Sequence, residues 1–132
     1  MTDAGTAPPR RRGRITRSGD FDMVYRRGRS AASRHLVVYA FTRDDRPPGT
    51  PARLGLSVSR KVGGAVERNR VKRVLREQFA ALQPGLPGGI DVVVIARPGC
   101  AEYIEERGSG ALGERLAELA ERATRESAGS SP

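Results

Sequence analysis

The chain is poor in the residues that small proteins use for covalent or metal cross-links. Its 132 residues include one cysteine, one histidine and no tryptophan. Because Cys100 has no second cysteine to pair with, an intrachain disulfide and a zinc cluster of several thiolates are both excluded. His35 stands equally alone, which excludes a multi-histidine metal site.

Long apolar runs are also missing. The start, MTDAGTAPPRRRGR, lacks the apolar core of a signal peptide, and nowhere do about 18 apolar residues follow one another. Together with the single cysteine, this predicts a soluble protein of a reducing cytoplasm. The length predicts one domain with one modest core.

Positive charge, in contrast, is abundant. The chain has 24 basic and 15 acidic residues, a formal net charge of +9, and only Lys61 and Lys72 are lysines. This balance indicates a polyanionic partner, either nucleic acid or an acidic membrane surface. Arginine binds phosphate oxygens as a two-pronged donor. Heavy arginine use also follows from a GC-rich genome, and that alternative stays open for the scattered arginines.

The pattern of apolar residues predicts an α+β domain. Residues 1–13, rich in Pro, Gly and Arg, are expected to form a flexible basic arm, 14–126 a single domain, and 127–132 a disordered tail. A short helix should run from Ser18 to a stop at Gly28. Further elements are expected as strands at 35–41, 54–59 and 90–96, and as helices at 66–82 and 110–126.

The predicted helix at 66–82 contains the densest positive charge, in the stretch ERNRVKRVLRE. At about 100° per residue, one arc collects Arg68, Asn69, Lys72, Arg73 and Arg76, and the opposite arc collects Val71, Val74, Leu75, Phe79 and Leu82. Like charges four residues apart repel each other. A solvated helix face is the simple alternative, but a helix selected only for solubility would interleave glutamates. The pattern therefore indicates that the missing anions belong to a partner.

Two shorter features adjoin this helix. Arg60 and Lys61 follow the strand at 54–59, and Gly63 with Gly64 permit a sharp turn or a close backbone approach. A Gly-Gly turn is usually only a connector, and no Walker pattern is present. Asn69 suggests a polar contact, although a simple first-turn residue explains it equally well.

These segments together resemble a known family. RNRVKRVLRE, preceded by LGLSVSRKVGGAVE and by SGDFDMVYRRGR, resembles the bacterial ribonuclease P protein component, over residues 15–98. The resemblance implies a two-layer α/β sandwich like the second domain of ribosomal protein S5. It also implies a left-handed β-α-β crossover, against the usual right-handed preference.

The resemblance implies a function as well. The family's protein assists a catalytic RNA that removes the 5′ leader from precursor tRNA, with Mg²⁺ held mainly by the RNA and no catalytic residue in the protein. Carried over by position, the contacts to the catalytic RNA would come from Arg68, Asn69, Arg70, Lys72, Arg73 and Arg76. The leader-binding cleft would be lined by Phe21, Tyr25, Val37 and Tyr39, with Arg60 and Lys61 at its edge.

Four other functions remain as alternatives. A nuclease made of protein alone needs clustered carboxylates or a histidine base, but Asp91 is expected to stand alone beside a strand, and His35 to be a satisfied or exposed histidine. A ribosomal or other structural RNA-binding protein on the same fold fits the charge equally well. A DNA-binding helix fits less well, because too few Asn, Gln or Arg residues at the helix start would face base edges without interruption by core-facing valines. A membrane-surface helix fits least well, because the apolar arc is needed for the core. Neither the arm at Arg10–Arg12 nor the loop at 44–51 receives a function.

Overall fold

The computed structural model describes residues 14–15, 18–47 and 49–129, with side chains as far as Arg125. Its elements follow in the order α2 (Ser18–Arg27), β1 (Arg29–Ala32), β2 (Leu36–Thr42), β3 (Arg53–Val58), α3 (Ala65–Leu82), a 3-10 turn (Gln83–Gly85), β4 (Ile90–Ala96), α4 (Cys100–Arg107) and α5 (Ser109–Gly129). The predicted basic arm at 1–13 lies outside the described residues. Helix α5 runs through Gly129, into the predicted tail at 127–132, of which residues 130–132 also lie outside the description.

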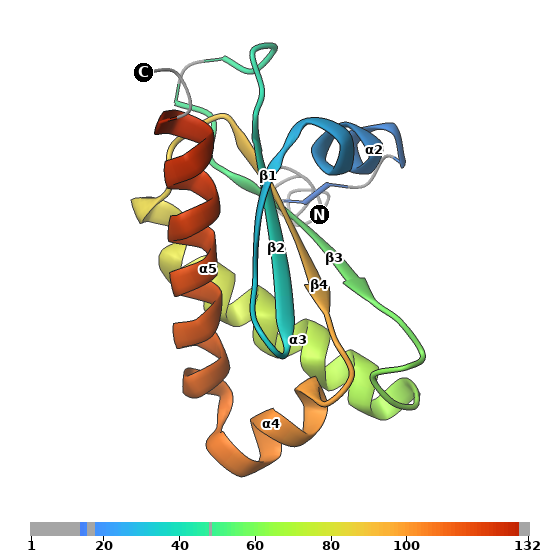
Figure 1. The fold of residues 1–132 in the computed structure, drawn as a ribbon. Helices are drawn as coiled ribbons and strands as arrows, with labels where there is room; N and C mark the ends of the chain where they lie inside the picture. The colour runs from blue at the N-terminus through green and yellow to red at the C-terminus, as the bar shows by residue number, and fades with distance from the viewer. Residues whose placement is uncertain (1–13, 16–17, 48, 130–132) are drawn as a thin grey trace, which may run out of the picture.

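The four strands form one sheet in the order β1-β2-β4-β3. β3 and β4 are parallel, and the other neighbours are antiparallel. Helices α3 and α5 cover one face of the sheet, and α2 packs over part of the other, which we call the second face (Figure 1). This is the predicted α+β arrangement, whereas the likeness to ribosomal protein S5 stays a prediction.

Alternation along the strands separates the two faces. The larger core lies between the sheet and the helices α3 and α5, and it includes the fully buried side chains of Leu36, Val38, Val92, Val94, Leu75, Leu112 and Leu116. The predicted apolar arc of α3 faces this core, since Val71, Val74, Leu75 and Phe79 are buried. The connection from β3 through α3 to β4 is left-handed, as the resemblance implied (Figure 1).

A smaller cluster holds α2 against the second face. Ile15, Val24 and Val93 are buried there, with Phe21 and Tyr39 packed at the margin. Two glycines allow α2 to approach the sheet closely. A Cβ atom on Gly55 would lie 2.8 Å from the Phe21 ring, and one on Gly28 would lie 2.5 Å from the Val24 carbonyl oxygen. Any larger residue at these positions would push α2 away from the sheet.

Two elements were not predicted. β1 is short, reads Arg-Ser-Ala-Ala and has only Ala31 buried, so it carries almost no hydrophobic signal. α4 lies in a segment that the sequence left without structure, and it is bounded by Gly99 and Gly108, both with positive φ. The predicted strands at 35–41 and 54–59 each differ from the observed β2 and β3 by one residue at both ends. Among the described residues, no helix is both long and apolar enough to cross a bilayer.

The single cysteine is inaccessible in the fold. Cys100 is fully buried at the start of α4, and this burial raises the pKa of its thiol to about 11. Because the thiolate is the reactive form, Cys100 should resist alkylation by iodoacetamide at pH 8 in the native protein and react at once in denaturant. Mass spectrometry of the labelled chain measures this, and rapid labelling without denaturant would contradict the packing of α4.

Candidate nucleic-acid interface

The polar arc of α3 forms a row of cations along the molecular surface. Asn69, Arg73 and Arg76 are exposed, and Arg68 and Lys72 are half-buried. We call these five residues the basic ridge. Their exposure leaves the guanidinium and ammonium groups able to reach an external anion, and the only acidic residue in the first turn of α3 is Glu67.

Arg70 lies apart from the basic ridge. Its guanidinium group donates to the carbonyl oxygen of Ala101 at 3.2 Å and pairs with Glu105 of α4 at 3.4 Å. Arg70 therefore links α3 to α4. Its carried-over contact with the catalytic RNA stays a prediction, and the other five residues of that set lie together as expected.

The register of the strands arranges the second face in three rows. From the lower end of the sheet in Figure 1 upward, they consist of Val37, Ile95 and Ser57; then Tyr39, Val93 and Gly55; and last Phe41, Asp91 and Arg53. The first row is half-buried and mostly apolar, the second lies under Phe21, and the third places the charged Asp91 and Arg53 beside Phe41. Of the predicted leader-binding residues, Val37 and Tyr39 thus lie in the first two rows, and Phe21 and Tyr25 lie on the helix above them.

Three aromatic rings gather over the second row. The Tyr25 and Tyr39 rings meet edge to face with centroids 5.2 Å apart, and the Phe21 and Tyr25 centroids are 6.4 Å apart. Tyr25 is 37% exposed, whereas Phe21 packs on Gly55 and belongs partly to the small core. Partial burial raises the pKa of Tyr25, and the neighbouring Tyr39 raises it further, so the Tyr25 hydroxyl stays protonated at neutral pH. We call Phe21, Tyr25 and Tyr39 the aromatic cluster.

The remaining predicted residues lie at the end of the sheet where β2 begins and β3 ends. Val37 is half-buried in the first row, and Arg60 and Lys61 are exposed in the turn that follows β3. The Val62 amide donates to the Ser59 carbonyl oxygen at 3.0 Å and closes this turn. At Gly63 a Cβ atom would lie 2.8 Å from Cβ of Glu67, so glycine permits the tight entry into α3.

A shallow groove joins the basic ridge to the aromatic cluster around the edge of the sheet. It has a volume of about 180 Å³ and is lined by Arg14, Ile15, Phe21, Leu54, Leu56, Lys72 and Arg76. β3 is the edge strand here, and the segment at Arg14 pairs with it at Leu54. The two surfaces are therefore neighbours rather than opposite poles of the domain.

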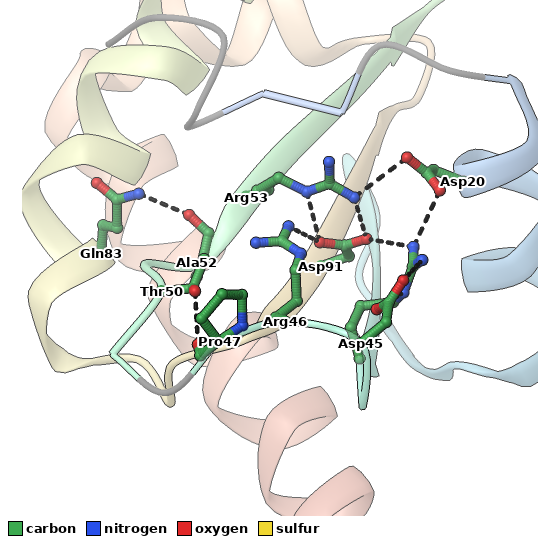
Figure 2. A network of polar contacts seen from close by, with 10 residues as sticks. Asp20, Asp45, Arg46, Pro47, Thr50, Ala52, Arg53, Gln83 and Asp91 are labelled. Atoms are coloured by element: carbon green, nitrogen blue, oxygen red, sulfur yellow. Dashed lines mark hydrogen bonds and ion pairs between the residues drawn. The ribbon is translucent and has the colours of Figure 1, made fainter. Parts of the chain in front are cut away.

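Asp91 belongs to no cluster of carboxylates that could hold a metal among the described residues, but it has basic partners that the sequence did not reveal. Its carboxylate is fully buried and accepts four hydrogen bonds, two from Arg53 at 2.7 and 2.9 Å, one from Arg46 at 2.9 Å and one from Arg43 at 3.2 Å (Figure 2). Two of these arginines, Arg43 and Arg46, lie between β2 and β3, and Arg46 belongs to the loop at 44–51, for which no function was predicted. A buried charge needs such partners, because desolvation disfavours the ionised form.

The same network reaches α2. Asp20 accepts from Arg43 at 3.0 Å and from Arg53 at 3.2 Å, and Arg43 also pairs with Asp45 at 2.7 Å (Figure 2). Partial burial raises the pKa of Asp20, but the hydrogen bonds and charges of the two arginines outweigh it, so the net pKa is lowered. Burial raises the pKa of Asp91, and Arg53 and Arg43 oppose this rise. We call these six residues the acid–arginine network: Asp20, Arg43, Asp45, Arg46, Arg53 and Asp91.

His35 lies in a third place, beside α4. Its ring stacks on Tyr103 with centroids 4.6 Å apart, and both line a cavity of about 550 Å³ that also contains three arginines and two glutamates. Burial, with Arg34, lowers the pKa of His35. The described residues contain no cluster of three or more His, Cys, Asp or Glu side chains that could hold a metal ion.

Comparisons with known proteins agree on one family. The profile of the family described as Ribonuclease P matches residues 10–121. A ribonuclease P protein component of Bacillus cereus strain AH187 is 42% identical over 93 residues, which is 70% of this chain and 78% of that protein. The corresponding Bacillus anthracis protein of strain CDC 684 has the same identity over 76% of its length.

Solved structures give the same result. A Staphylococcus aureus RNase P protein mutant with defective mRNA degradation activity is 30% identical, with a TM-score of 0.75 over 90% of this chain and 99% of that one. The RNase P protein from Thermotoga maritima is 34% identical, with a TM-score of 0.68 over 83% of this chain and 96% of that one.

Proposed function

Because the chain belongs to the ribonuclease P protein family, whose members are components of a tRNA-processing endoribonuclease, we propose that it holds two RNAs at once. The basic ridge, with Arg70, binds the catalytic RNA. The second face binds the 5′ leader of precursor tRNA through the aromatic cluster and Val37, with Arg60 and Lys61 at the edge. The observation that carries the proposal is the placement of these two surfaces side by side on one domain.

The chemistry of the basic ridge suits a folded, phosphate-rich partner. Exposed arginines at helical spacing bind phosphate oxygens with two donors each, and they release condensed counterions when they bind. The mutual repulsion within the row disappears when phosphates neutralise it. The ridge has few base-reading groups, so it suits recognition by shape and backbone.

The second face suits a single strand instead. Unpaired bases stack on aromatic side chains, at about 1–3 kcal/mol per base. Tyr25 offers an exposed ring, and the apolar row that contains Val37 continues the surface toward Arg60 and Lys61. The side chains of Arg60 and Lys61, which follow β3, would contact the leader's phosphates.

In this proposal the protein breaks no bond. It adds contacts to the leader and reduces the repulsion between two polyanions, so that the catalytic RNA works at a lower Mg²⁺ concentration. The Mg²⁺ ions would be held mainly by the RNA, where they would activate the water for hydrolysis. Neither a small-molecule substrate nor a membrane has a place in this function.

Reconstitution tests the proposed function. Precursor tRNA at low Mg²⁺ should be cleaved at the 5′ end of the mature sequence by the catalytic RNA with this protein, and far more slowly by the RNA alone. Cleavage by the protein alone would contradict the proposal. So would an unchanged rate together with stoichiometric co-purification on ribosomes, which is the outcome expected of a structural ribosomal protein.

The aromatic cluster gives a second test. Tyr25→Ala should weaken binding of a precursor with a long leader by about five- to a hundredfold, because about 1–3 kcal/mol of stacking is lost. Tyr25→Phe, which keeps the ring, should bind nearly as tightly as the original chain. Equilibrium binding to the holoenzyme measures both, with mature tRNA as the ligand that neither variant should affect. Equal losses for precursor and mature tRNA would place the leader elsewhere.

A further inference from the structure

The leader-binding surface depends on how α2 is set against the sheet, since α2 carries Phe21 and Tyr25. Two contacts attach this helix. One is the apolar contact of Val24 and Phe21 with the second face, and the other is the polar contact of Asp20 with Arg43 and Arg53 (Figure 2). Asp20 lies in the first turn of α2, and Gly28 follows the last turn, so the polar contact fixes the end opposite to Gly28.

The arginines that hold Asp20 are themselves immobilised. Nη2 of Arg53 donates both to Asp20 and to the buried Asp91, and Nη1 of Arg43 does the same. Asp91 is fully buried, and the exposed fractions of the Arg43 and Arg53 side chains are only 13% and 18%. Arg43 and Arg53 therefore fix the position of Asp20 relative to Asp91 on the central strand β4, and not relative to a mobile surface side chain.

We propose that Asp20 is a positioning residue for the 5′ leader. It holds the first turn of α2 at a fixed distance and rotation over the second face, which places the Tyr25 ring over the row of Tyr39. Asp20 itself does not contact the leader, because its oxygens face Arg43 and Arg53. This inference depends on the proposed leader-binding function and adds a residue outside the aromatic cluster to it.

Simple electrostatics predicts the opposite result, which makes the proposal testable. A carboxylate near an RNA strand repels it, so removing any acidic residue from α2 should by itself tighten leader binding. Asp22 is the matched control: it lies in the same helix, two residues away, and is exposed. If charge alone matters, Asp20→Ala and Asp22→Ala should have the same effect.

The experiment uses the reconstituted holoenzyme and precursors with a long and a one-nucleotide leader. We expect Asp20→Ala to raise KM for the long leader about three- to tenfold, with kcat at saturation, affinity for the catalytic RNA and KM for the short leader unchanged. Asp22→Ala should leave KM unchanged or lower it. Equal behaviour of the two variants, or an equal loss on both leaders, would overturn the proposal.

A double variant shows whether Asp20 acts through α2. With Tyr25→Ala present, adding Asp20→Ala should change KM for the long leader little, because the ring to be positioned is gone. If the two effects multiply, the positioning role is wrong. Should Asp20→Ala fold incompletely, Asp20→Asn against Asp22→Asn decides the same question. An absence of any effect of Tyr25→Ala alone would instead refute the proposed leader site itself.

Discussion

Reversing the charge of Arg68 and Arg73 together should weaken binding of the catalytic RNA by about two orders of magnitude or more. Each arginine is expected to make a charge-assisted contact with phosphate, and such hydrogen bonds contribute about 1.5–3 kcal/mol. Two lost contacts at about 1.4 kcal/mol per tenfold already give a factor of a hundred, and the introduced glutamates add repulsion. Arg73 is exposed and Arg68 half-buried, so the fold should persist.

The salt dependence of binding distinguishes this effect from general loss of charge. Each phosphate contact contributes on the order of one unit to the slope of log K against log salt, so the variant should have a slope shallower by about two units. Arg122→Glu with Arg125→Glu on α5 gives the same change in net charge at two exposed positions. Filter binding from low to moderate salt measures both, and equal losses in the two double variants would contradict a specific basic ridge.

The second large effect concerns stability. Asp91→Ala should lower the free energy of unfolding by about 3–5 kcal/mol, because it leaves the positive charges of three partly buried arginines without their buried carboxylate partner. Arg43, Arg46 and Arg53 all donate to this carboxylate, and their side chains are 12–18% exposed. For a domain whose total stability is about 5–15 kcal/mol, this loss approaches the limit of folding.

Asp45 supplies the control for that prediction. It pairs with Arg43 at 2.7 Å but is 65% exposed, so Asp45→Ala should leave the free energy of unfolding nearly unchanged. Urea titration followed by circular dichroism measures both variants. If Asp91→Ala cost as little as Asp45→Ala, the buried carboxylate would not be the centre of the acid–arginine network.

The sequence predicted α3 well because two independent patterns agreed there. The apolar residues at helical spacing face the core, and the cations between them face outward, so the pattern alone placed the basic ridge. The strands β2, β3 and β4 were found from their β-branched residues. β1 and α4 were missed because each offers few apolar side chains: β1 is held by its pairing with β2 and by α5, and α4 is held by α3 and α5.

The acid–arginine network was missed for a different reason. A carboxylate at the start of an apolar strand was a usable signal, since a buried charge must have partners, but the sequence could not say which of 24 basic residues would supply them. The basic partners come from two separate segments, at 43–46 and at Arg53, and Asp20 joins them from α2, so only the folded chain brings the network together. The left-handed crossover came from the family resemblance, because spacing carries no information on handedness.

Site-directed hydroxyl-radical cleavage tests the two-surface account most directly. An iron chelate can be attached to Asn69→Cys on the basic ridge or to Val37→Cys on the second face, since the buried Cys100 should not react. In the holoenzyme with bound precursor tRNA, we predict that radicals from position 69 cleave the catalytic RNA and those from position 37 cleave the 5′ leader. Cleavage of the same strand from both positions, or of neither RNA, would contradict the account.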